Sequence, residues 1–395
     1  MSAEVVIVSA VRTPMGGFQG ELSTVSATQL GSIAIRAALA VPSQQGNVSV
    51  DEVLMGNVLS AGVGQAPARQ AALSAGLPVS TPCTTVSKVC GSGMKAIMLA
   101  SDQIAAGSID VAVAGGMESM SQAPYILPNA RSGQRLGHGE MLDHMFYDGL
   151  QNASDGQLMG CFADQNAKLD GISREQMDDY AIESLQRAQV AIEQGAFVNE
   201  ITPVVVKTRR DELIIDRDEQ PPKAKPEKIP TLRPAFGKDG AVTAANASSI
   251  SDGAAALLVM SRKKAEQLGL TILAVIKAHT SHAEMPEKFT HAPIGAIQKV
   301  LQKADWSIDD VDLFEVNEAF AMVAIAAKQA LSLPVDKMNV NGGATALGHP
   351  IGASGARIVV TLIHALRNQG KTKGVASLCI GGGEATAIAI ECPSS

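Results

Sequence analysis

The sequence predicts an α/β protein made of two similar halves, with a long segment inserted between their matching parts. Three observations support this fold class. Short apolar runs rich in β-branched residues alternate with longer segments of helical apolar spacing, which is typical of sheets covered by helices. The 37 glycines can supply the tight turns that such alternation needs. One series of motifs also occurs twice in the same order.

The repeat defines the elements of each half. The first half contains, in order, an apolar strand, a strand ending in Asn57, a helix that follows Cys90 and a strand ending in glycines: 5–8, 51–57, 94–106 and 111–118. The second half repeats this series: 272–276, 312–317, 356–369 and 375–384. Asn57 matches Asn317 at an offset of 260 residues (317 − 57), and Cys90 matches His349 at nearly the same offset. A duplicated α/β unit with mostly parallel or mixed sheets is therefore expected.

The segment 119–248 has no counterpart in the repeat. It is rich in Gly, Pro, Asn and charged residues, and it contains a helical pattern over 173–194. We therefore expect an N-terminal half at 1–118 that is completed by about 249–270, an inserted loop domain at 119–248, and a C-terminal half at 271–395. Long insertions of this kind often carry binding residues, although a solvated decoration of the fold is the simpler alternative.

Charge and cysteine content narrow the classes of function. The formal net charge is −7, which argues against non-specific nucleic-acid binding because phosphates attract positive charge. The five cysteines are dispersed and odd in number, so neither a disulfide framework nor a metal site is expected. Because no leader, no membrane-length apolar run and no nucleotide-binding motif is found, we expect a cytoplasmic protein without a permanently bound cofactor.

Cys90 is the first candidate for catalysis. It stands at a predicted strand-to-helix junction and is followed by the small residues Gly91, Ser92 and Gly93. A helix N-terminus carries partial positive charge and free N–H groups, which favour a thiolate, and small neighbours let a substrate approach. The alternative is a small buried apolar side chain.

His349 is the second candidate, held in a turn between Gly348 and Pro350. Its imidazole can accept a proton near neutral pH, although a turn histidine can equally cap a backbone carbonyl. The repeat places Cys90 and His349 at equivalent ends of the two halves. The two side chains can therefore meet in one pocket if the halves pack about a pseudo-twofold axis.

Two further residues follow predicted strands. Cys379 precedes three glycines whose backbone N–H groups can stabilise an oxyanion, or it is an ordinary buried strand residue. Asn317 can orient a water or hold a carbonyl, and it can also serve as the N-cap of a helix over 318–331.

Four motifs together resemble those of the thiolases over essentially the full chain. They are the segment around Cys90, N-E-A-F at 317–320, G-H-P-I-G at 348–352 and C-I-G-G-G at 379–383. The resemblance implies a thiolase-like duplicated, five-layered αβαβα fold with an inserted loop domain for CoA binding and tetramerisation. It also implies a homotetramer, built as a dimer of dimers, that acts on CoA thioesters.

The resemblance further implies a reversible Claisen condensation of two acetyl-CoA molecules to acetoacetyl-CoA and CoA through an acetyl-cysteine intermediate, with ping-pong kinetics. Cys90 would be acylated, His349 would take its proton, and Cys379 would move a proton at the α-carbon of the second acyl group. One oxyanion hole would consist of His349 and a water held by Asn317. The other would consist of the backbone N–H groups of Cys90 and Gly381.

The CoA contacts implied by the resemblance lie mostly in the insert and at its exit. They are a pantetheine contact, three apolar contacts, two acyl-pocket residues and a basic residue near the adenine: Ser248; Phe236, Ala319 and Phe320; Met159 and Leu158; Lys223 or Lys225. Two positions depart from acetoacetyl-CoA thiolases. Leu158 stands where a His usually precedes the methionine, and Phe289 lies in a segment where many have a Met-Gly pair before a proline. Both changes leave the acyl length open.

Three alternatives stay open. The first is a 3-oxoacyl-CoA thiolase for longer acyl chains, and the second is a decarboxylating condensing enzyme. The second cysteine, Cys379, favours a thiolase, since such decarboxylating relatives use Cys-His-His or Cys-His-Asn sets. The third is a non-catalytic acyl-CoA-binding protein, which would be expected to have lost Cys90 or His349.

Overall fold

The structure is a computed structural model that describes residues 3–42, 48–208 and 211–393. The expected parts 1–118, 119–248 and 271–395 each include a few residues outside these described ranges. The strands of the N-terminal half lie in the order β4-β3-β5-β10-β1. Their bounds are β1 Val5–Arg12, β3 Glu52–Gly56, β4 Cys83–Val86, β5 Val111–Ser119 and β10 Ser251–Ser261. A two-residue strand, β2 (Gly16–Gly17), pairs with β10.

The strands of the C-terminal half lie in the matching order β12-β13-β14-β11. Their bounds are β11 Ala274–Ala283, β12 Leu313–Val316, β13 Lys373–Ile380 and β14 Glu384–Glu391. Antiparallel pairing of β1 with β11 connects the two sets into one mixed sheet. The N-terminal half is completed by β10, which follows the insert in sequence.

The hydrogen-bond register repeats as the sequence does. Strand β3 runs parallel to β4 and β5, and β12 runs parallel to β13. A parallel bridge from Phe314 to Met338 stands where β4 stands in the first half. The carboxylate of Asp51 accepts the N–H groups that open β5, and that of Asp312 accepts those that open β13. The predicted duplication is therefore confirmed in detail.

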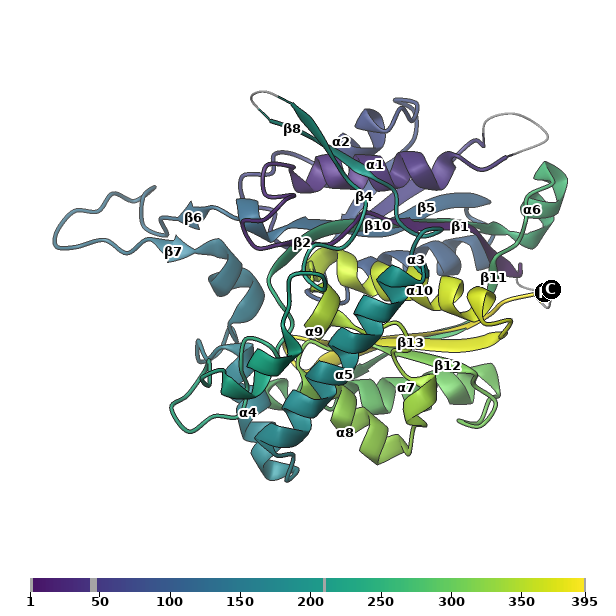
Figure 1. Ribbon diagram of the computed structural model, residues 1–395. Helices are drawn as coiled ribbons and strands as arrows, with labels where there is room; N and C mark the ends of the chain where they lie inside the picture. Colours follow the sequence, from purple (N-terminus) through teal and green to yellow (C-terminus); the bar gives the residue numbers. More distant parts are fainter. Residues whose placement is uncertain (1–2, 43–47, 209–210, 394–395) are drawn as a thin grey trace.

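The helices complete five layers (Figure 1). Helices α1 (Ala27–Leu39) and α2 (Pro67–Ser74) cover the outer face of the N-terminal strands. Helices α7 (Ala292–Ala304) and α8 (Ala321–Leu331) cover that of the C-terminal strands. Between the two sets lie α3 (Ser92–Ala105) and α10 (Ile351–Asn368), which contact strands of both halves. Short helix α6 (Arg262–Leu268) contacts β1 and β10, and short helix α9 (Ala344–Leu347) packs against α5 (Arg174–Glu193).

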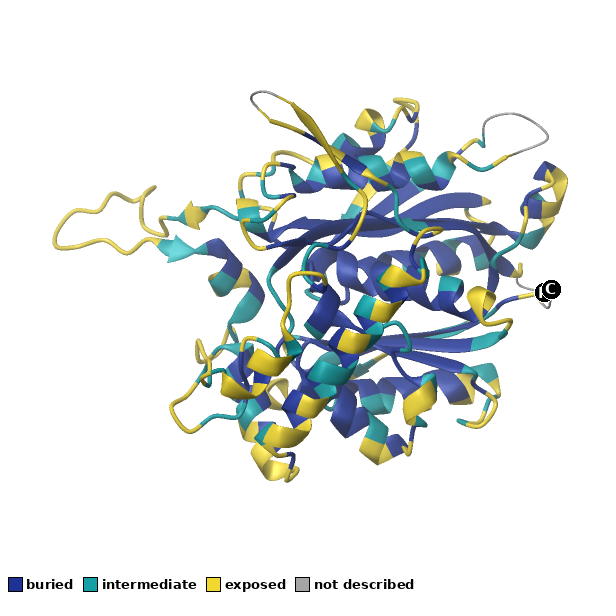
Figure 2. Ribbon diagram, in the orientation of Figure 1, coloured by how far each residue is buried: buried dark blue, intermediate teal, exposed yellow. Residues whose placement is uncertain are grey.

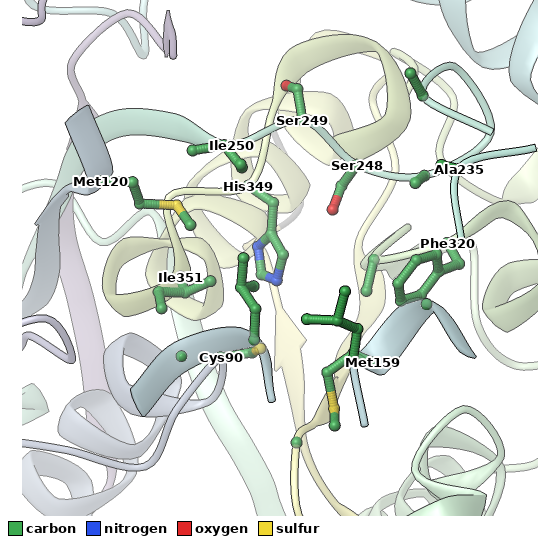
Figure 3. A pocket seen from close by; sticks show the side chains of 18 of the residues that line it. Cys90, Met120, Met159, Ala235, Ser248, Ser249, Ile250, Phe320, His349 and Ile351 are labelled. Atoms are coloured by element: carbon green, nitrogen blue, oxygen red, sulfur yellow. The ribbon is translucent and has the colours of Figure 1, made fainter. Parts of the chain in front are cut away.

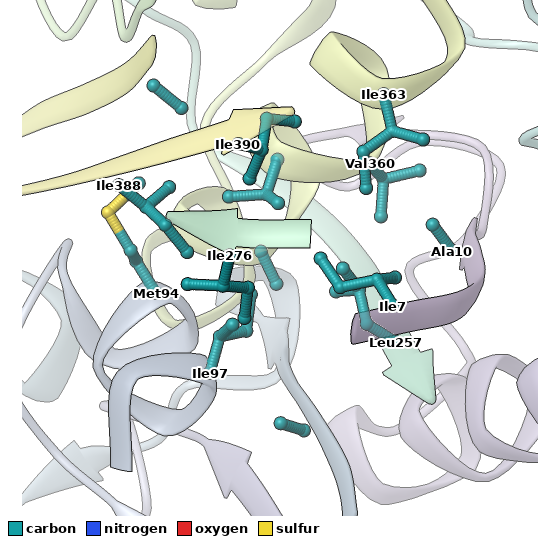
Figure 4. Packing of buried hydrophobic residues seen from close by; sticks show 14 of the residues in the cluster. Ile7, Ala10, Met94, Ile97, Leu257, Ile276, Val360, Ile363, Ile388 and Ile390 are labelled. Atoms are coloured by element: carbon teal, nitrogen blue, oxygen red, sulfur yellow. The ribbon is translucent and has the colours of Figure 1, made fainter. Parts of the chain in front are cut away.

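The middle layer is the most buried part of the fold (Figure 2). Isoleucines and valines of α3, α10 and the flanking strands interlock around it, as Figure 4 shows for Ile97, Val360 and Ile388. Glycines let the two helices touch backbone to backbone. A Cβ added at Gly355 would lie 2.5 Å from the nitrogen of Met94, so no larger residue fits without a shift. This close approach brings the N-terminal ends of α3 and α10 together.

The insert contains a long hairpin, two α-helices and a second hairpin, together with shorter helical turns. The first hairpin, β6 (Tyr125–Ile126) with β7 (Leu142–Asp143), projects from the body and is largely exposed (Figures 1 and 2). The other elements are a π-helix, two α-helices, two strands and two 3₁₀ helices: Met145–Leu150; α4 Met159–Leu169 and α5 Arg174–Glu193; β8 Val204–Lys207 and β9 Glu212–Ile215; Met120–Gln122 and Pro226–Thr231. The helix expected at 173–194 is confirmed, because α5 is bounded by Ser173 as N-cap and Gln194 as C-cap.

Two expected boundaries are wrong. Helix α8 begins at Ala321 with Phe320 as its N-cap residue, so Asn317 does not cap a helix over 318–331. The strand expected at 375–384 ends at Ile380, because Gly382 and Gly383 adopt positive φ values and turn the chain into β14. In both places the chain turns at the end of a strand: after β12 in place of the expected helix start, and after β13 in place of the expected strand end.

Candidate active site

A cavity of about 410 Å³ opens at the N-terminal ends of α3 and α10. Four of the five predicted catalytic residues line it: Cys90, His349, Cys379 and Gly381. Figure 3 shows the imidazole of His349 pointing into the cavity towards Cys90. The pseudo-symmetric ends of the two halves therefore meet in one site, as the repeat predicted.

A strained turn presents Cys90. Val89, a β-branched residue, has φ of 46°, a left-handed conformation that such residues rarely adopt. Ser92 holds the turn, because its Oγ accepts the backbone N–H of Lys88 at 2.8 Å and donates to the carbonyl of Val89 at 2.7 Å. Helix α3 starts immediately afterwards, so the Cys90 side chain is fixed at the helix entrance.

The environment of Cys90 keeps it protonated in the free protein. Burial raises the pKa of its thiol to about 11, although the backbone N–H groups of Gly381 and of Cys90 itself donate to the sulfur and act in the opposite direction. This differs from the expectation that the helix N-terminus makes a thiolate. Because the apolar walls outweigh the N–H groups, Cys90 needs a base to lose its proton near neutral pH.

His349 has a geometry that suits such a base. Its Nδ1 lies 2.5 Å from the Oγ of Ser354, and this Oγ already donates its own proton to the carbonyl of Pro350 at 2.9 Å. With the hydroxyl proton on that carbonyl, Nδ1 carries the imidazole proton, which leaves the lone pair on Nε2. Nε2 has no partner among the described residues. Burial, followed by the charge of Arg357, lowers the pKa of His349 to about 3, so the ring is neutral.

Cys379 and Gly381 approach Cys90 from the other half. Cys379 lies near the end of β13 and is 1% exposed. Burial raises the pKa of the Cys379 thiol well above its usual value, and ionisation of the neighbouring Cys90 acts in the same direction. The turn that follows directs the N–H of Gly381 at the sulfur of Cys90. Two sulfurs and one imidazole thus share a single, largely apolar pocket.

Asn317 lies behind this wall and does not line the cavity. Its backbone N–H donates to the carbonyl of Ser377, two residues before Cys379. Its side chain is 1% exposed, its Oδ1 accepts a 3.5 Å hydrogen bond from Arg357, and its Nδ2 has no partner among the described residues. A buried amide donor without a protein partner is uncommon and calls for an explanation, such as a bound water.

The predicted acyl-CoA contacts also converge. All six apolar or hydroxyl candidates line the same cavity: Leu158, Met159, Phe236, Ser248, Ala319 and Phe320. Phe320 stacks edge-to-face with Phe236 and with Phe289, each at a centroid distance of 6.2 Å. These rings form an aromatic wall at the position where the sequence departs from acetoacetyl-CoA thiolases.

Lys223 lies elsewhere. Together with Lys225 it lines a neighbouring cavity of about 350 Å³, which shares Gln220 with the cavity of Cys90. The ammonium of Lys223 donates to Glu21 at 2.8 Å and to Glu219 at 2.9 Å. The two carboxylates hold the ammonium at the second cavity, while the Lys223 side chain itself stays 59% exposed.

Several residues that line the cavity were not predicted from the sequence. Met120, Phe146, Leu150 and Ile351 form an apolar cluster beside Cys90. Three of them follow a strand or lie in the π-helix, where no periodic spacing of hydrophobic residues marks them.

Glu118 is a further residue near the site, and the sequence does mark it, as the end of the repeated glycine motif. Its buried carboxylate accepts N–H groups from the first half and from the N-terminus of α10. Burial raises the pKa of Glu118 to about 7.

Other site classes receive no support within the described residues. No group of three or more His, Cys, Asp or Glu side chains there is arranged to hold a metal ion. None of the helices in the described ranges has both the length and the apolar character needed to cross a bilayer.

Comparison with known proteins shows the family of this chain. Residues 5–263 match the family model for the thiolase N-terminal domain, and residues 270–392 match that for the thiolase C-terminal domain. The acetyl-CoA acetyltransferase of Chromobacterium violaceum is 49% identical over 99% of this chain and all of its own length. That of Escherichia coli is 51% identical over 98% of each chain. The solved structure of the acetyl-CoA acetyltransferase from Syntrophomonas wolfei superposes with a TM-score of 0.96, at 41% identity and full coverage of both chains. This chain belongs to the thiolase family.

Proposed function

We propose that the protein is an acetyl-CoA C-acetyltransferase, which converts two molecules of acetyl-CoA reversibly into acetoacetyl-CoA and CoA. One observation supports this most strongly: Cys90, His349 and Cys379 meet in one apolar cavity, and two backbone N–H groups converge on the nucleophilic sulfur. The full-length relatives named above carry the same activity in their names.

The first half-reaction acetylates Cys90. Its sulfur attacks the thioester carbonyl of acetyl-CoA while its proton passes to Nε2 of His349. The backbone N–H groups of Cys90 and Gly381 stabilise the oxyanion. The carbon–sulfur bond to CoA then breaks, and the leaving thiolate takes the proton of Cys379. The products are acetyl-Cys90, protonated His349, a Cys379 thiolate and CoA.

The second half-reaction forms the carbon–carbon bond. The Cys379 thiolate removes a proton from the methyl group of a second acetyl-CoA, and burial favours this because the thiolate of a thiol with a raised pKa is a stronger base. The enolate carbon attacks the carbonyl of acetyl-Cys90, whose carbon–sulfur bond breaks. His349 returns its proton to Cys90, and acetoacetyl-CoA is released. His349 and a water held by Asn317 stabilise the enolate oxygen.

The acyl-CoA lies along the exit of the insert. Ser248 contacts the pantetheine. Its backbone N–H donates to the carbonyl of Ala319 at 2.9 Å, which fixes the chain segment that carries Ser248. Phe236 and Phe320 provide apolar contact, and Leu158 with Met159 borders the acyl group. Lys223 stands at the adjoining cavity, where it faces the phosphorylated end of CoA.

The insert also mediates assembly into a homotetramer, a dimer of dimers. Its projecting hairpin exposes Leu127, Leu136 and Met141, the second of them 98% exposed. Apolar side chains on a protruding hairpin are typical of a surface that another subunit covers. The same proposal places the insert at 119–248 and the protein in the cytoplasm. It also takes CoA thioesters as substrates, with no permanently bound cofactor.

The test is CoA-dependent cleavage of acetoacetyl-CoA beside 3-oxooctanoyl-CoA and 3-oxohexadecanoyl-CoA. We expect cleavage of acetoacetyl-CoA, its loss in Cys90→Ala and its retention in the matched control Cys83→Ala. Preference for the longer substrates would instead make the protein a 3-oxoacyl-CoA thiolase, with Leu158 and Phe289 shaping a longer acyl site. A folded wild type that cleaves nothing would leave the decarboxylating condensing enzyme and the non-catalytic acyl-CoA-binding protein.

A further inference from the structure

A buried polar group lies behind the cavity wall that contains Cys379. Arg357 of α10, Glu315 of β12 and Asn317 are each at most 2% exposed. Nη1 of Arg357 is 3.7 Å from an oxygen of Glu315, and Nη2 donates to Oδ1 of Asn317 at 3.5 Å. Its Nε and Nη1 have no hydrogen-bond partner among the described residues. A buried cation with so few contacts is costly, so its retention needs a reason.

Arg12 shows what a structural buried arginine looks like in this chain. Its Nε donates to Glu200 at 2.5 Å, and its two Nη atoms donate to the carboxylate of Asp218 at 2.7 and 2.8 Å. Two close carboxylates thus satisfy the guanidinium. Arg357 has no such pair of close carboxylates. Burial therefore lowers the pKa of Arg357, whereas Asp218 and Glu200 raise the pKa of Arg12. The hydrogen bond that Arg357 does make goes to Asn317.

This hydrogen bond fixes the Asn317 amide. Because Oδ1 accepts from the guanidinium, Nδ2 is turned away from it, and a flipped amide would set two donors against each other. A water that accepts from Nδ2 keeps both of its hydrogens for a substrate oxyanion. His349 Nε2 also lacks a partner within the described ranges, so both groups of the proposed oxyanion site are unpaired in the free protein.

Helix α10 carries the supports for both of these groups. Ser354 and Arg357 are three residues apart and therefore lie on the same helix face. Ser354 holds the His349 ring, and Arg357 holds the Asn317 amide. The charge of Arg357 also contributes, after burial, to the low pKa of His349.

We propose that Arg357 is a positioning residue of the oxyanion site, holding the Asn317 carboxamide so that its Nδ2 is available to the water that stabilises the enolate. This inference rests on the proposed function. It assigns Arg357 to the carbon–carbon step, because the N–H groups of Cys90 and Gly381 already serve the acyl group on Cys90.

The experiment separates the two half-reactions. Exchange of labelled CoA into acetyl-CoA reports acetylation of Cys90, and cleavage of acetoacetyl-CoA adds the carbon–carbon step. We expect Arg357→Met to lower cleavage by about 10- to 100-fold, below the effect of losing a direct oxyanion donor. Exchange should stay within about threefold of the wild type. The double variant with Asn317→Ala should be no slower than Asn317→Ala alone, because both changes remove one function.

Further variants exclude a merely structural role. Burial raises the pKa of Glu315 to about 8 and the cation of Arg357 acts in the opposite direction, so the carboxyl takes up a proton in Arg357→Met. Glu315→Gln is combined with Arg357→Met to remove this titrating group, and cleavage should stay low in the combined variant. Arg12→Lys serves as the control, with reduced stability and an unchanged ratio of cleavage to exchange. Equal losses in both reactions, multiplied losses in the double variant, or full rescue by Glu315→Gln would overturn the proposal. A wild type that shows neither reaction would overturn the proposed function itself.

Discussion

Replacing Ser354 by alanine tests how His349 is made a base. The substitution removes the oxygen 2.5 Å from Nδ1 but leaves the carbonyl of Pro350 paired, because it also accepts the backbone N–H of Ser354 at 2.9 Å. The Nδ1 proton would then be buried without an acceptor, at a cost of about 1–3 kcal/mol. The ring can avoid this cost by moving its proton to Nε2, which faces the cavity.

That move disables the base. Nε2 with a proton cannot accept another from Cys90, so the reactive tautomer becomes the minor one. A cost of about 1–3 kcal/mol corresponds to a decrease of about 5- to 150-fold in its population. We therefore expect Ser354→Ala to acetylate Cys90 more slowly by about one order of magnitude, with little change in the free energy of unfolding.

Rapid mixing with acetyl-CoA, followed by mass determination of the acetylated protein, measures this step directly. Ser101→Ala is the matched control, since Ser101 is a buried serine of α3 that does not line the cavity. Acetylation of Ser354→Ala at the wild-type rate would refute the tautomer argument. An equal slowing in Ser101→Ala would show that any buried serine has the same effect.

Two further predictions concern pH and packing. Because burial raises the pKa of Cys90 to about 11, its thiolate fraction grows tenfold per pH unit below that value. Alkylation of Cys90 by iodoacetamide should therefore rise about tenfold per unit from pH 7 to pH 9, whereas a plateau above pH 8 would contradict the raised pKa. A Cβ at Gly116 would lie 2.1 Å from the carbonyl oxygen of Gly352, so Gly116→Ala should lower the free energy of unfolding by about 1–3 kcal/mol or more and impair cleavage of acetoacetyl-CoA. Gly237→Ala, where a Cβ meets nothing within 4 Å, is the control; equal denaturation midpoints for both variants would show that this contact is unimportant.

Much of the fold could be predicted from the sequence because its information is local and repeated. Apolar runs of strand length, helical spacing and glycine turns occur twice in one order, and the strands and central helices appear where these patterns predicted them. The boundaries at Asn317 and Gly382 could not be predicted, because each depends on a turn whose geometry neighbouring strands impose.

The candidate site divides in the same way. The sequence by itself determined which residues could do chemistry: Cys90, His349 and Cys379 stand in turn-forming motifs with small neighbours, and the repeat related two of them. Only the tertiary structure decided their protonation states and their supports. Burial made Cys90 a thiol rather than a thiolate, and Ser354 selected the tautomer of His349. The walls that bury Cys90 come from residues far apart in the chain, so no local pattern contains them. Ser354 is only five residues from His349, but their hydrogen bond depends on how the turn into α10 folds.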